Sequence, residues 1–193
     1  MADFVTITPA MRESVLRHLR ESFFADEPLN RAVGLCERGQ PHAALERLCA
    51  ATMADGLMNY VDGDRSAGTD PRHNRDIDAE MITFFVISQY HHESGFQVDS
   101  ILECRIISVS EAARGRGLAK ELMKKSIDIA KEHGFKLFKV DATGAFSQRI
   151  CSSLGLRTLR RVAYVEYCDS TGAPIFEVPP PHEALSVMVL EIP

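Results

Sequence analysis

The chain has 193 residues, of which 45% are hydrophobic and 25% are charged, and its formal net charge is −5 at neutral pH. This composition is typical of a soluble globular protein, and the length suits one domain over residues 1–193 better than two. The acidic balance disfavours a general nucleic-acid-binding protein, because such proteins neutralise phosphates with an excess of lysine and arginine.

The N-terminal part is predicted to alternate short strands and helices. Residues 4–7 form a candidate strand, and Thr8-Pro9 indicates a helix start, with Thr8 as N-cap and Pro9 in the first helical position. Apolar residues at helical spacing continue this first helix to about residue 23. A second helix is predicted over 42–53 and a strand over 57–61.

The interval up to residue 100 is interpreted as a loop followed by a helix. Residues 62–75 are rich in Gly, Asp, Arg and Ser, which is typical of a loop. Residues 76–90 are predicted to be helical, with Ile77, Met81, Phe84, Phe85 and Ile87 as apolar anchors.

The C-terminal part gives clearer patterns. Residues 117–133 place Leu118, Leu122 and Ile127 on one helical face, and Gly134 is suited to end this helix. The other elements predicted here are strands over 101–109, 137–141, 162–168 and 186–192, and a short helix over 146–154. The alternation of strands and helices indicates an α/β or α+β sandwich.

The strongest local motif is Arg-Gly-Arg-Gly-Leu-Ala over residues 114–119, which follows a predicted strand and opens a predicted helix. The first N–H groups of a helix lack intrahelical partners, and glycine lets the backbone approach a ligand closely. This arrangement favours a pyrophosphate site. A Walker loop is excluded because its Gly-Lys-Ser/Thr ending is absent. A dinucleotide-binding fingerprint is disfavoured because its three spaced glycines are absent. A plain exposed turn remains open as the alternative.

The same segment resembles a known family. Arg114, Gly117 and Ala119 fit the pattern Arg/Gln-x-x-Gly-x-Gly/Ala of the acetyl-CoA loop in GNAT acetyltransferases. Further segments resemble, in order, the insect arylalkylamine N-acetyltransferases of this superfamily: residues 26–30 (Asp-Glu-Pro-Leu-Asn), 142–147 with 154–156, 164–167 and 179–189. The resemblance implies a GNAT fold, with a mixed central sheet flanked by helices and CoA bound at a strand–loop–helix turn.

The resemblance also implies a cosubstrate and a reaction. Acetyl-CoA would be the acyl donor, with its pantetheine arm along the backbone of Ile107, Ser108 and Val109, which amounts to strand addition. The residues expected around the pyrophosphate are Arg114, Gly115, Arg116, Gly117, Leu118, Ala119 and Lys120. The acceptor would be a small primary amine that attacks the thioester directly in a ternary complex.

Glu27 is the candidate general base by this resemblance. An alkylammonium group has a pKa near 10.4, so the amine must lose a proton before it attacks, either to Glu27 directly or through water. The alternative is that residues 26–28 form a solvated turn. Ser147 is the candidate donor of a proton to the leaving thiolate, with Thr143 one helical turn earlier, where the family usually has serine. Both hydroxyls could equally act as helix caps.

Leu29 and Tyr164 are the candidate residues of the amine pocket. His91, His92 and His182 are expected to be surface or capping residues, because their spacing does not fit a metal site. The cysteines are odd in number and widely spaced, so we expect reduced thiols in a cytoplasmic protein. We expect no signal peptide, no membrane segment, no metal, and a monomer that binds acetyl-CoA and its amine substrate.

One departure from the family pattern bears on activity. Two antiparallel strands are expected between the second helix and the CoA-binding strand, but only residues 57–61 are recognised as one. A shortened hairpin would weaken the sheet and the amine groove, so CoA binding is better supported than turnover. Two further hypotheses therefore remain: an acetyltransferase for polyamines or other alkylamines, and a catalytically weak acetyl-CoA-binding module.

Overall fold

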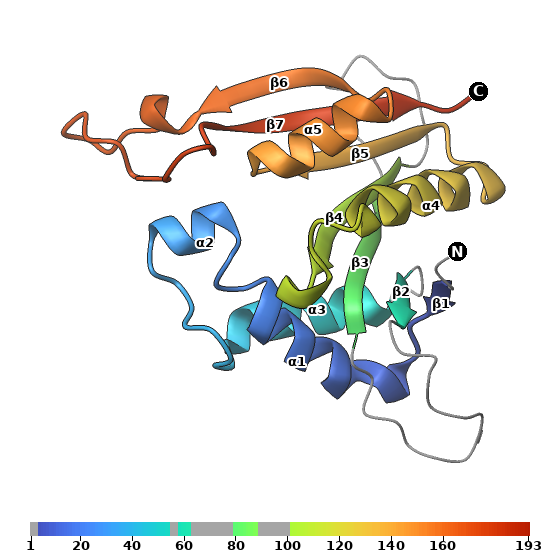
Figure 1. Ribbon diagram of the computed structural model, residues 1–193. Helices are drawn as coiled ribbons and strands as arrows, with labels where there is room; N and C mark the ends of the chain where they lie inside the picture. The colour runs from blue at the N-terminus through green and yellow to red at the C-terminus, as the bar shows by residue number, and fades with distance from the viewer. Residues whose placement is uncertain (1–3, 55–57, 63–78, 89–100) are drawn as a thin grey trace.

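The computed structural model describes residues 4–54, 58–62, 79–88 and 101–193, which build a seven-stranded sheet in the order β1-β2-β3-β4-β5-β7-β6 (Figure 1). Its strands are β1 (Phe4–Thr6), β2 (Met58–Asp62), β3 (Ala79–Ser88), β4 (Ile101–Val109), β5 (Leu137–Ala142), β6 (Arg157–Ala163) and β7 (Ala184–Glu191). The pairing of β4 with β5 is parallel, and the other neighbouring pairs are antiparallel. This confirms the mixed α/β architecture expected from the sequence.

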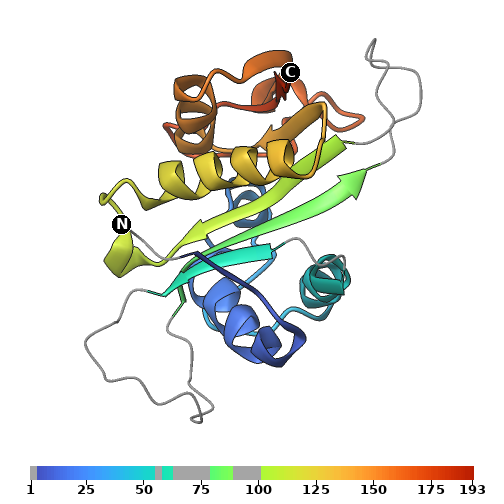
Figure 2. The same cartoon turned by 90° about the vertical axis from the view of Figure 1, so that its right-hand side faces the viewer.

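Helices cover both faces of the sheet, with α1 and α3 on one face and α4 on the other (Figure 2). The α-helices are α1 (Arg12–Ser22), α2 (Pro28–Ala32), α3 (Ala43–Ala54), α4 (Leu118–Glu132) and α5 (Ala145–Ser153). The α4–α5 side holds the larger buried cluster, which includes Leu102, Met123 and Phe138, and the α1 side holds a second cluster around Leu16, Leu19 and Phe24. Among the described residues, no helix is long and apolar enough to cross a membrane.

The helix predicted over 117–133 is confirmed as α4. Leu122, Met123 and Ile127 are buried, as their helical spacing requires. Gly117 begins the helix in the left-handed region (φ +80°), and Gly134 follows its end at φ +76°. Glycine adopts both conformations without the steric penalty that a Cβ atom brings, which explains the two glycines at the helix ends.

The helix predicted over 76–90 is wrong, because residues 79–88 form β3. This strand lies inside the sheet, with β2 on one side and β4 on the other. Interior strands often have a nearly continuous apolar run, which periodicity alone does not distinguish from a buried helix. Together β2 and β3 supply the hairpin that the sequence analysis did not recognise. The expectation of a shortened hairpin, which favoured a catalytically weak binding module, is therefore also wrong.

Two smaller corrections concern the residues around the sheet. The strand predicted over 162–168 lies instead at Arg157–Ala163, and Tyr164–Glu166 form a 3-10 turn. Residues 157–161 are exposed, since β6 is an edge strand, so they show none of the alternation that marks a half-buried strand. Residues 28–32, for which the sequence analysis predicts no helix, form the short helix α2.

A β-bulge at Arg105 shapes the middle of the sheet. Cys104 pairs with Phe85 and Ile106 with Phe84, so Arg105 is an extra residue in β4. Before it, Cys104 packs into the α4–α5 cluster, whereas after it Ile106 packs into the α1 cluster. The residues of β4 after the bulge therefore face the side of the sheet opposite to the one that regular alternation would give.

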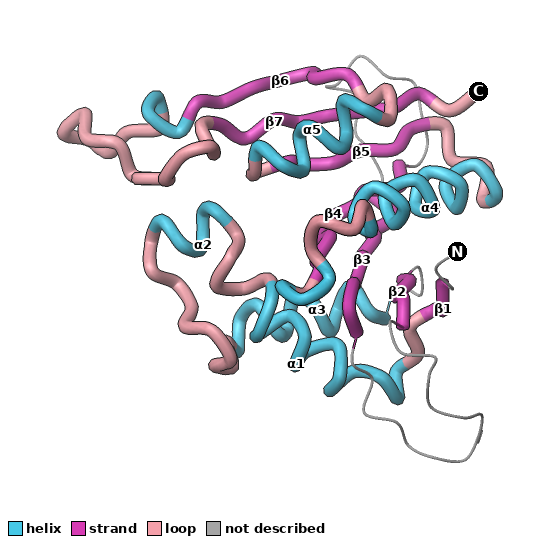
Figure 3. The backbone as a smooth tube through the Cα atoms, viewed as in Figure 1, coloured by secondary structure: helices cyan, strands magenta, loops and turns pink. Residues whose placement is uncertain are grey.

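The sheet divides just past this bulge. The pairing of β4 with β5 covers only Leu102–Cys104 against Phe138–Val140, and the strands then diverge, as the tube in Figure 3 shows. Residues 106–109 of β4 keep β3 as a partner on one side, and no strand in the described part of the chain pairs with them on the β5 side. The sheet therefore offers an open backbone edge where its two arms separate.

Candidate active site

The turn over residues 114–120, named the acyl-donor turn after the role expected of it from the sequence, lies at the end of this open edge. Gly115 and Gly117 both have positive φ (+79° and +80°), and a Cβ atom built on either meets nothing within 4 Å. The N–H groups that begin α4, from Leu118 and Ala119, point out of the first turn without intrahelical partners. The turn is thus an open cradle of backbone donors at the positive end of a 15-residue helix.

The edge of β4 leads into this cradle. Ile107 and Val109 pack against the Leu118–Leu122 cluster of α4, while the Ser108 hydroxyl is 2.9 Å from Nε2 of His18 on α1. Both Ser108 and His18 are buried, so the strand is fixed from both faces of the sheet. An extended pantetheine chain fits the strand edge, and a pyrophosphate fits the helix start, so the residues present suit CoA.

Glu27 is the N-cap of the short helix α2. Its Oε2 accepts a hydrogen bond of 2.7 Å from the backbone N–H of Asn30. Its Oε1 is buried and accepts no hydrogen bond from any residue in the described part of the chain. A buried carboxylate oxygen without a donor is costly, and a protonated amine or a water molecule would satisfy it.

The start of α5 meets Glu27's helix and the β6–β7 connection at Gly144. A Cβ atom built on Gly144 would lie 3.3 Å from Nδ1 of His182 and 3.6 Å from Cγ of Pro28. His182 also accepts a hydrogen bond of 3.1 Å at Nδ1 from the Ala145 N–H. Three segments distant in sequence therefore meet around Gly144, next to the carboxylate of Glu27.

The two predicted hydroxyl residues lie at this junction. Ser147 donates a 2.8 Å hydrogen bond to the Gly144 carbonyl, so it forms a contact typical of a helix start. The Thr143 carbonyl accepts a 2.5 Å hydrogen bond from the Tyr164 hydroxyl. Burial, together with the negative charge of Glu27, raises the pKa of Tyr164 to about 12. Tyr164 is thus a buried, protonated neighbour of Glu27 at neutral pH.

Leu29 and His182 are the remaining candidate residues that the structure describes. Leu29 is half-buried on α2, directly after Glu27-Pro28. His182 caps α5 as predicted, but its position near Glu27 was missed, because only the fold brings residue 182 to residue 27. Burial and the charge of Arg31 lower the pKa of His182, and the opposing charge of Glu27 does not offset them. His91 and His92 lie outside the described residues.

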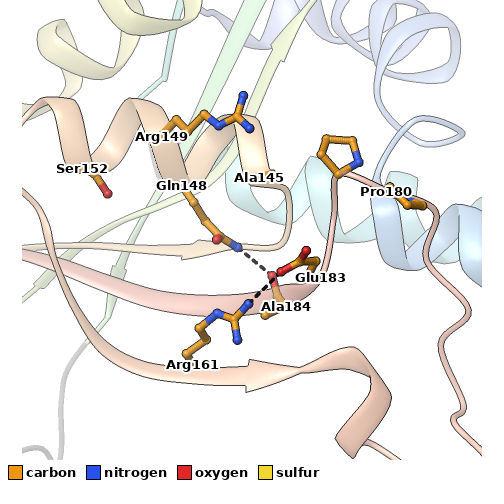
Figure 4. A pocket seen from close by; sticks show the side chains of 9 residues that line it. Ala145, Gln148, Arg149, Ser152, Arg161, Pro180, Glu183 and Ala184 are labelled. Atoms are coloured by element: carbon orange, nitrogen blue, oxygen red, sulfur yellow. Dashed lines mark hydrogen bonds and ion pairs between the residues drawn. The ribbon is translucent and has the colours of Figure 1, made fainter.

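A shallow cavity of about 680 Å³ lies between α5, the end of β6 and the start of β7 (Figure 4). Its polar lining comes from Gln148, Arg149, Ser152, Arg161 and Glu183. The amide of Gln148 donates to the carbonyls of Ala142 and Ala184, at 3.0 and 2.6 Å, and so holds α5 to the ends of β5 and β7. None of the residues predicted for the reaction lines this cavity, so we assign it no part in the reaction.

Comparisons with known proteins agree with this geometry. A sequence profile described as the acetyltransferase (GNAT) family matches residues 74–155. The structure of arylalkylamine N-acetyltransferase 2 from Aedes aegypti is similar, with 35% sequence identity, 99% of each chain covered and a TM-score of 0.89.

More distant structures share the fold. A polyamine N-acetyltransferase from Drosophila melanogaster, described as forming N-acetylagmatine, is 20% identical over 98% of this chain and all of its own, with a TM-score of 0.75. A putative acetyltransferase from Salmonella typhimurium, solved with acetyl-CoA, is 15% identical over all of this chain and 95% of its own, with a TM-score of 0.59.

Proposed function

The chain belongs to the GNAT acetyltransferase family, and from this premise we propose that it transfers the acetyl group of acetyl-CoA to a small primary arylalkylamine of the dopamine, serotonin or tryptamine type. Acetyl-CoA is the acyl donor of the GNAT fold, and amines are the acceptors of the similar acetyltransferases. The aromatic acceptor is the finer part of the proposal, and it rests on the 35% identity to the Aedes enzyme.

The observation that carries the proposal is the buried Oε1 of Glu27. A protonated amine that bound there would donate a hydrogen bond to this oxygen and then lose a proton to it, directly or through water. The second oxygen is held by the Asn30 N–H at 2.7 Å, so the carboxylate cannot rotate freely away from the amine. Glu27 is therefore our general base, and Leu29 and Tyr164 border the amine.

On the donor side, the backbone of residues 107–109 would hold the pantetheine arm and the acyl-donor turn would hold the pyrophosphate. These contacts would put the thioester where β4 and β5 diverge, next to the start of α5. The amine nitrogen attacks the thioester carbonyl, the C–N bond forms, and the C–S bond breaks. Ser147 supplies the proton to the leaving thiolate, and Thr143 is the second candidate for this role.

The test is an incubation of the full chain with acetyl-CoA and a panel of amines: tryptamine, dopamine, serotonin and spermidine. Products are read by mass spectrometry, because the free cysteines of the protein would react with a thiol dye. Glu27→Gln keeps an acceptor for the Asn30 N–H but removes the base. We expect a roughly 10²- to 10⁴-fold lower kcat for the arylalkylamine, the range typical of a general base.

Glu37→Gln is the matched control, because Glu37 is an exposed glutamate in the connection that follows α2. Its turnover should equal that of the unmodified chain. Product from spermidine alone would move the acceptor class to polyamines. An absence of product from every amine would refute the proposal, and full activity in Glu27→Gln would refute the assigned base.

The proposal includes a monomeric, cytoplasmic enzyme that needs no metal and has neither nucleic acid nor membrane as a partner. Size-exclusion chromatography with light scattering tests the oligomeric state. Activity retained after dialysis against EDTA tests the independence from metal.

A further inference from the structure

Asp26, the residue before the proposed base, is joined to the acyl-donor turn. Its Oδ2 is 2.7 Å from Nη2 of Arg114, and its Oδ1 is 2.5 Å from Nη2 of Arg38. Arg38 also donates to the backbone carbonyl of Glu21, at the end of α1. A single carboxylate thus connects the segment of Glu27, the turn that would hold pyrophosphate, and the connection after α2.

Arg114 is held at a second point. Its Nε donates a 3.3 Å hydrogen bond to the carbonyl of Val109, the last residue of β4. The guanidinium therefore folds back over the end of the strand, with one edge on the strand and another on Asp26. The Asp26 carboxylate offsets much of its charge. A guanidinium is suited to this double role, because its planar donors bind two acceptors in fixed directions.

The protonation state of Asp26 agrees with a firm pair. Burial acts to raise the pKa of Asp26, but hydrogen bonds from Arg114 and Arg38 outweigh it and hold this pKa below its usual value. Asp26 is therefore ionised at neutral pH, as its pairing with Arg114 and Arg38 requires. The pair is partly exposed, with 47% of the Arg114 side chain and 26% of the Asp26 side chain accessible.

We propose that Asp26 is a positioning residue, which sets the shape of the acyl-donor turn through Arg114 and fixes Glu27 against that turn. The inference rests on the proposed function and deepens it, since it names a link between the two substrate sites. Binding of the acyl donor then depends on a carboxylate that lies outside residues 107–120.

Simple electrostatics gives the opposite expectation, and this makes the inference testable. A carboxylate close to a pyrophosphate site repels the anion, and it withholds Arg114 from the phosphates. If charge alone mattered, Asp26→Asn would strengthen acetyl-CoA binding. If Asp26 positions the turn, Asp26→Asn weakens binding, by about fivefold, because exposed ion pairs contribute at most modestly.

The experiment measures the Kd of acetyl-CoA by calorimetry on the full chain without amine, well below the melting temperature of each variant. Asp26→Asn and Arg114→Gln are each expected to raise this Kd, and the double variant is expected to be no worse than Arg114→Gln, because both remove the same contact. Arg38→Gln is the matched control, since it removes the other arginine of Asp26. We expect it to change the Kd less than twofold.

Unchanged or tighter binding in Asp26→Asn overturns the inference, as does an additive double variant or an equal loss in Arg38→Gln. If Asp26→Asn does not fold, Asp26→Glu takes its place, because it keeps the charge but displaces the carboxylate: positioning by Asp26 predicts a higher Kd, whereas charge alone predicts no change. An unmodified chain that binds no acetyl-CoA would refute the proposed function instead, so the two failures are distinct. In steady state, Asp26→Asn should also lower kcat for the amine, as expected when Glu27 loses its alignment.

Discussion

Residues 107–120, the proposed donor side, follow one another in the chain and offer mainly backbone atoms to a ligand. The proposed acceptor side, formed around Glu27, Gly144, Tyr164 and His182, is assembled from several distant segments and offers side chains. A backbone cradle depends on φ angles and on a helix start, which short sequence patterns encode. A side-chain site depends on tertiary packing, so its members are separated in sequence. The two sides should therefore respond to different substitutions.

Among the substitutions that separate the two sides, the largest expected effect is on the donor side, from Gly117→Ala. Gly117 has φ +80°, and an L-residue there costs about 1–2 kcal/mol, so the turn should shift or strain. We expect roughly 5- to 30-fold weaker acetyl-CoA binding by calorimetry. Gly134→Ala is the control, because Gly134 has similar φ (+76°) at the other end of α4. A comparable loss in that variant would show that the effect is not specific to the turn.

On the acceptor side, Gly144→Ala should separate the two halves most clearly. The added methyl would lie 3.3 Å from Nδ1 of His182, closer than an ordinary contact, so His182 must move by tenths of an ångström. Overpacking of this kind costs about 1–3 kcal/mol, so we expect roughly a tenfold lower kcat/KM for the amine. Acetyl-CoA affinity should remain unchanged, and a parallel loss of both would argue against separate sides.

The Tyr164→Phe variant tests a single contact on the acceptor side. It removes the hydrogen bond to the Thr143 carbonyl, which is worth about 1 kcal/mol, and leaves that carbonyl without this donor. A chain of this length should melt about 2–4 °C lower, as measured by circular dichroism. An unchanged melting temperature would mean that this hydrogen bond does not contribute to stability.

The smallest effect concerns pH and His182. Its pKa is lowered in the folded protein, so the unfolded chain binds a proton first as pH falls below the ordinary value of about 6.5. This contribution to stability is complete above that pH and is lost as pH falls toward the folded pKa. His182→Asn keeps an acceptor for the Ala145 N–H but does not titrate. The melting temperature should fall less between pH 7.5 and 5.5 in this variant than in the unmodified chain.

The same contrast explains what the sequence could predict. The helix at 118–132 and its glycine ends are encoded locally, by spacing and by residues that tolerate positive φ. Glu27 was selected by resemblance, whereas its buried Oε1 and its proximity to residues 144 and 182 depend on how α2 meets α5. No short window of sequence contains that information.

The error at β3 has a related cause. Residues 79–88 are an apolar run whose spacing also fits a helix, and only pairing with β2 and β4 decides between the two. The predicted bounds of β6, residues 162–168, are wrong for the opposite reason, because the strand begins with the exposed residues 157–161. Its arginines suggest a loop, while the edge of a sheet accommodates them as a strand.

The backbone cradle at residues 114–120 has a consequence for evolution. If the main chain of this turn recognises the acyl donor, as proposed, the segment demands little of its side chains beyond two glycines, Arg114 and the buried Leu118, so substitutions at its other positions would be nearly neutral. The acceptor side could then diverge after gene duplication while the donor side was inherited unchanged. New amine specificities would arise by replacing a few residues around Glu27, with no need to rebuild the binding of the shared donor.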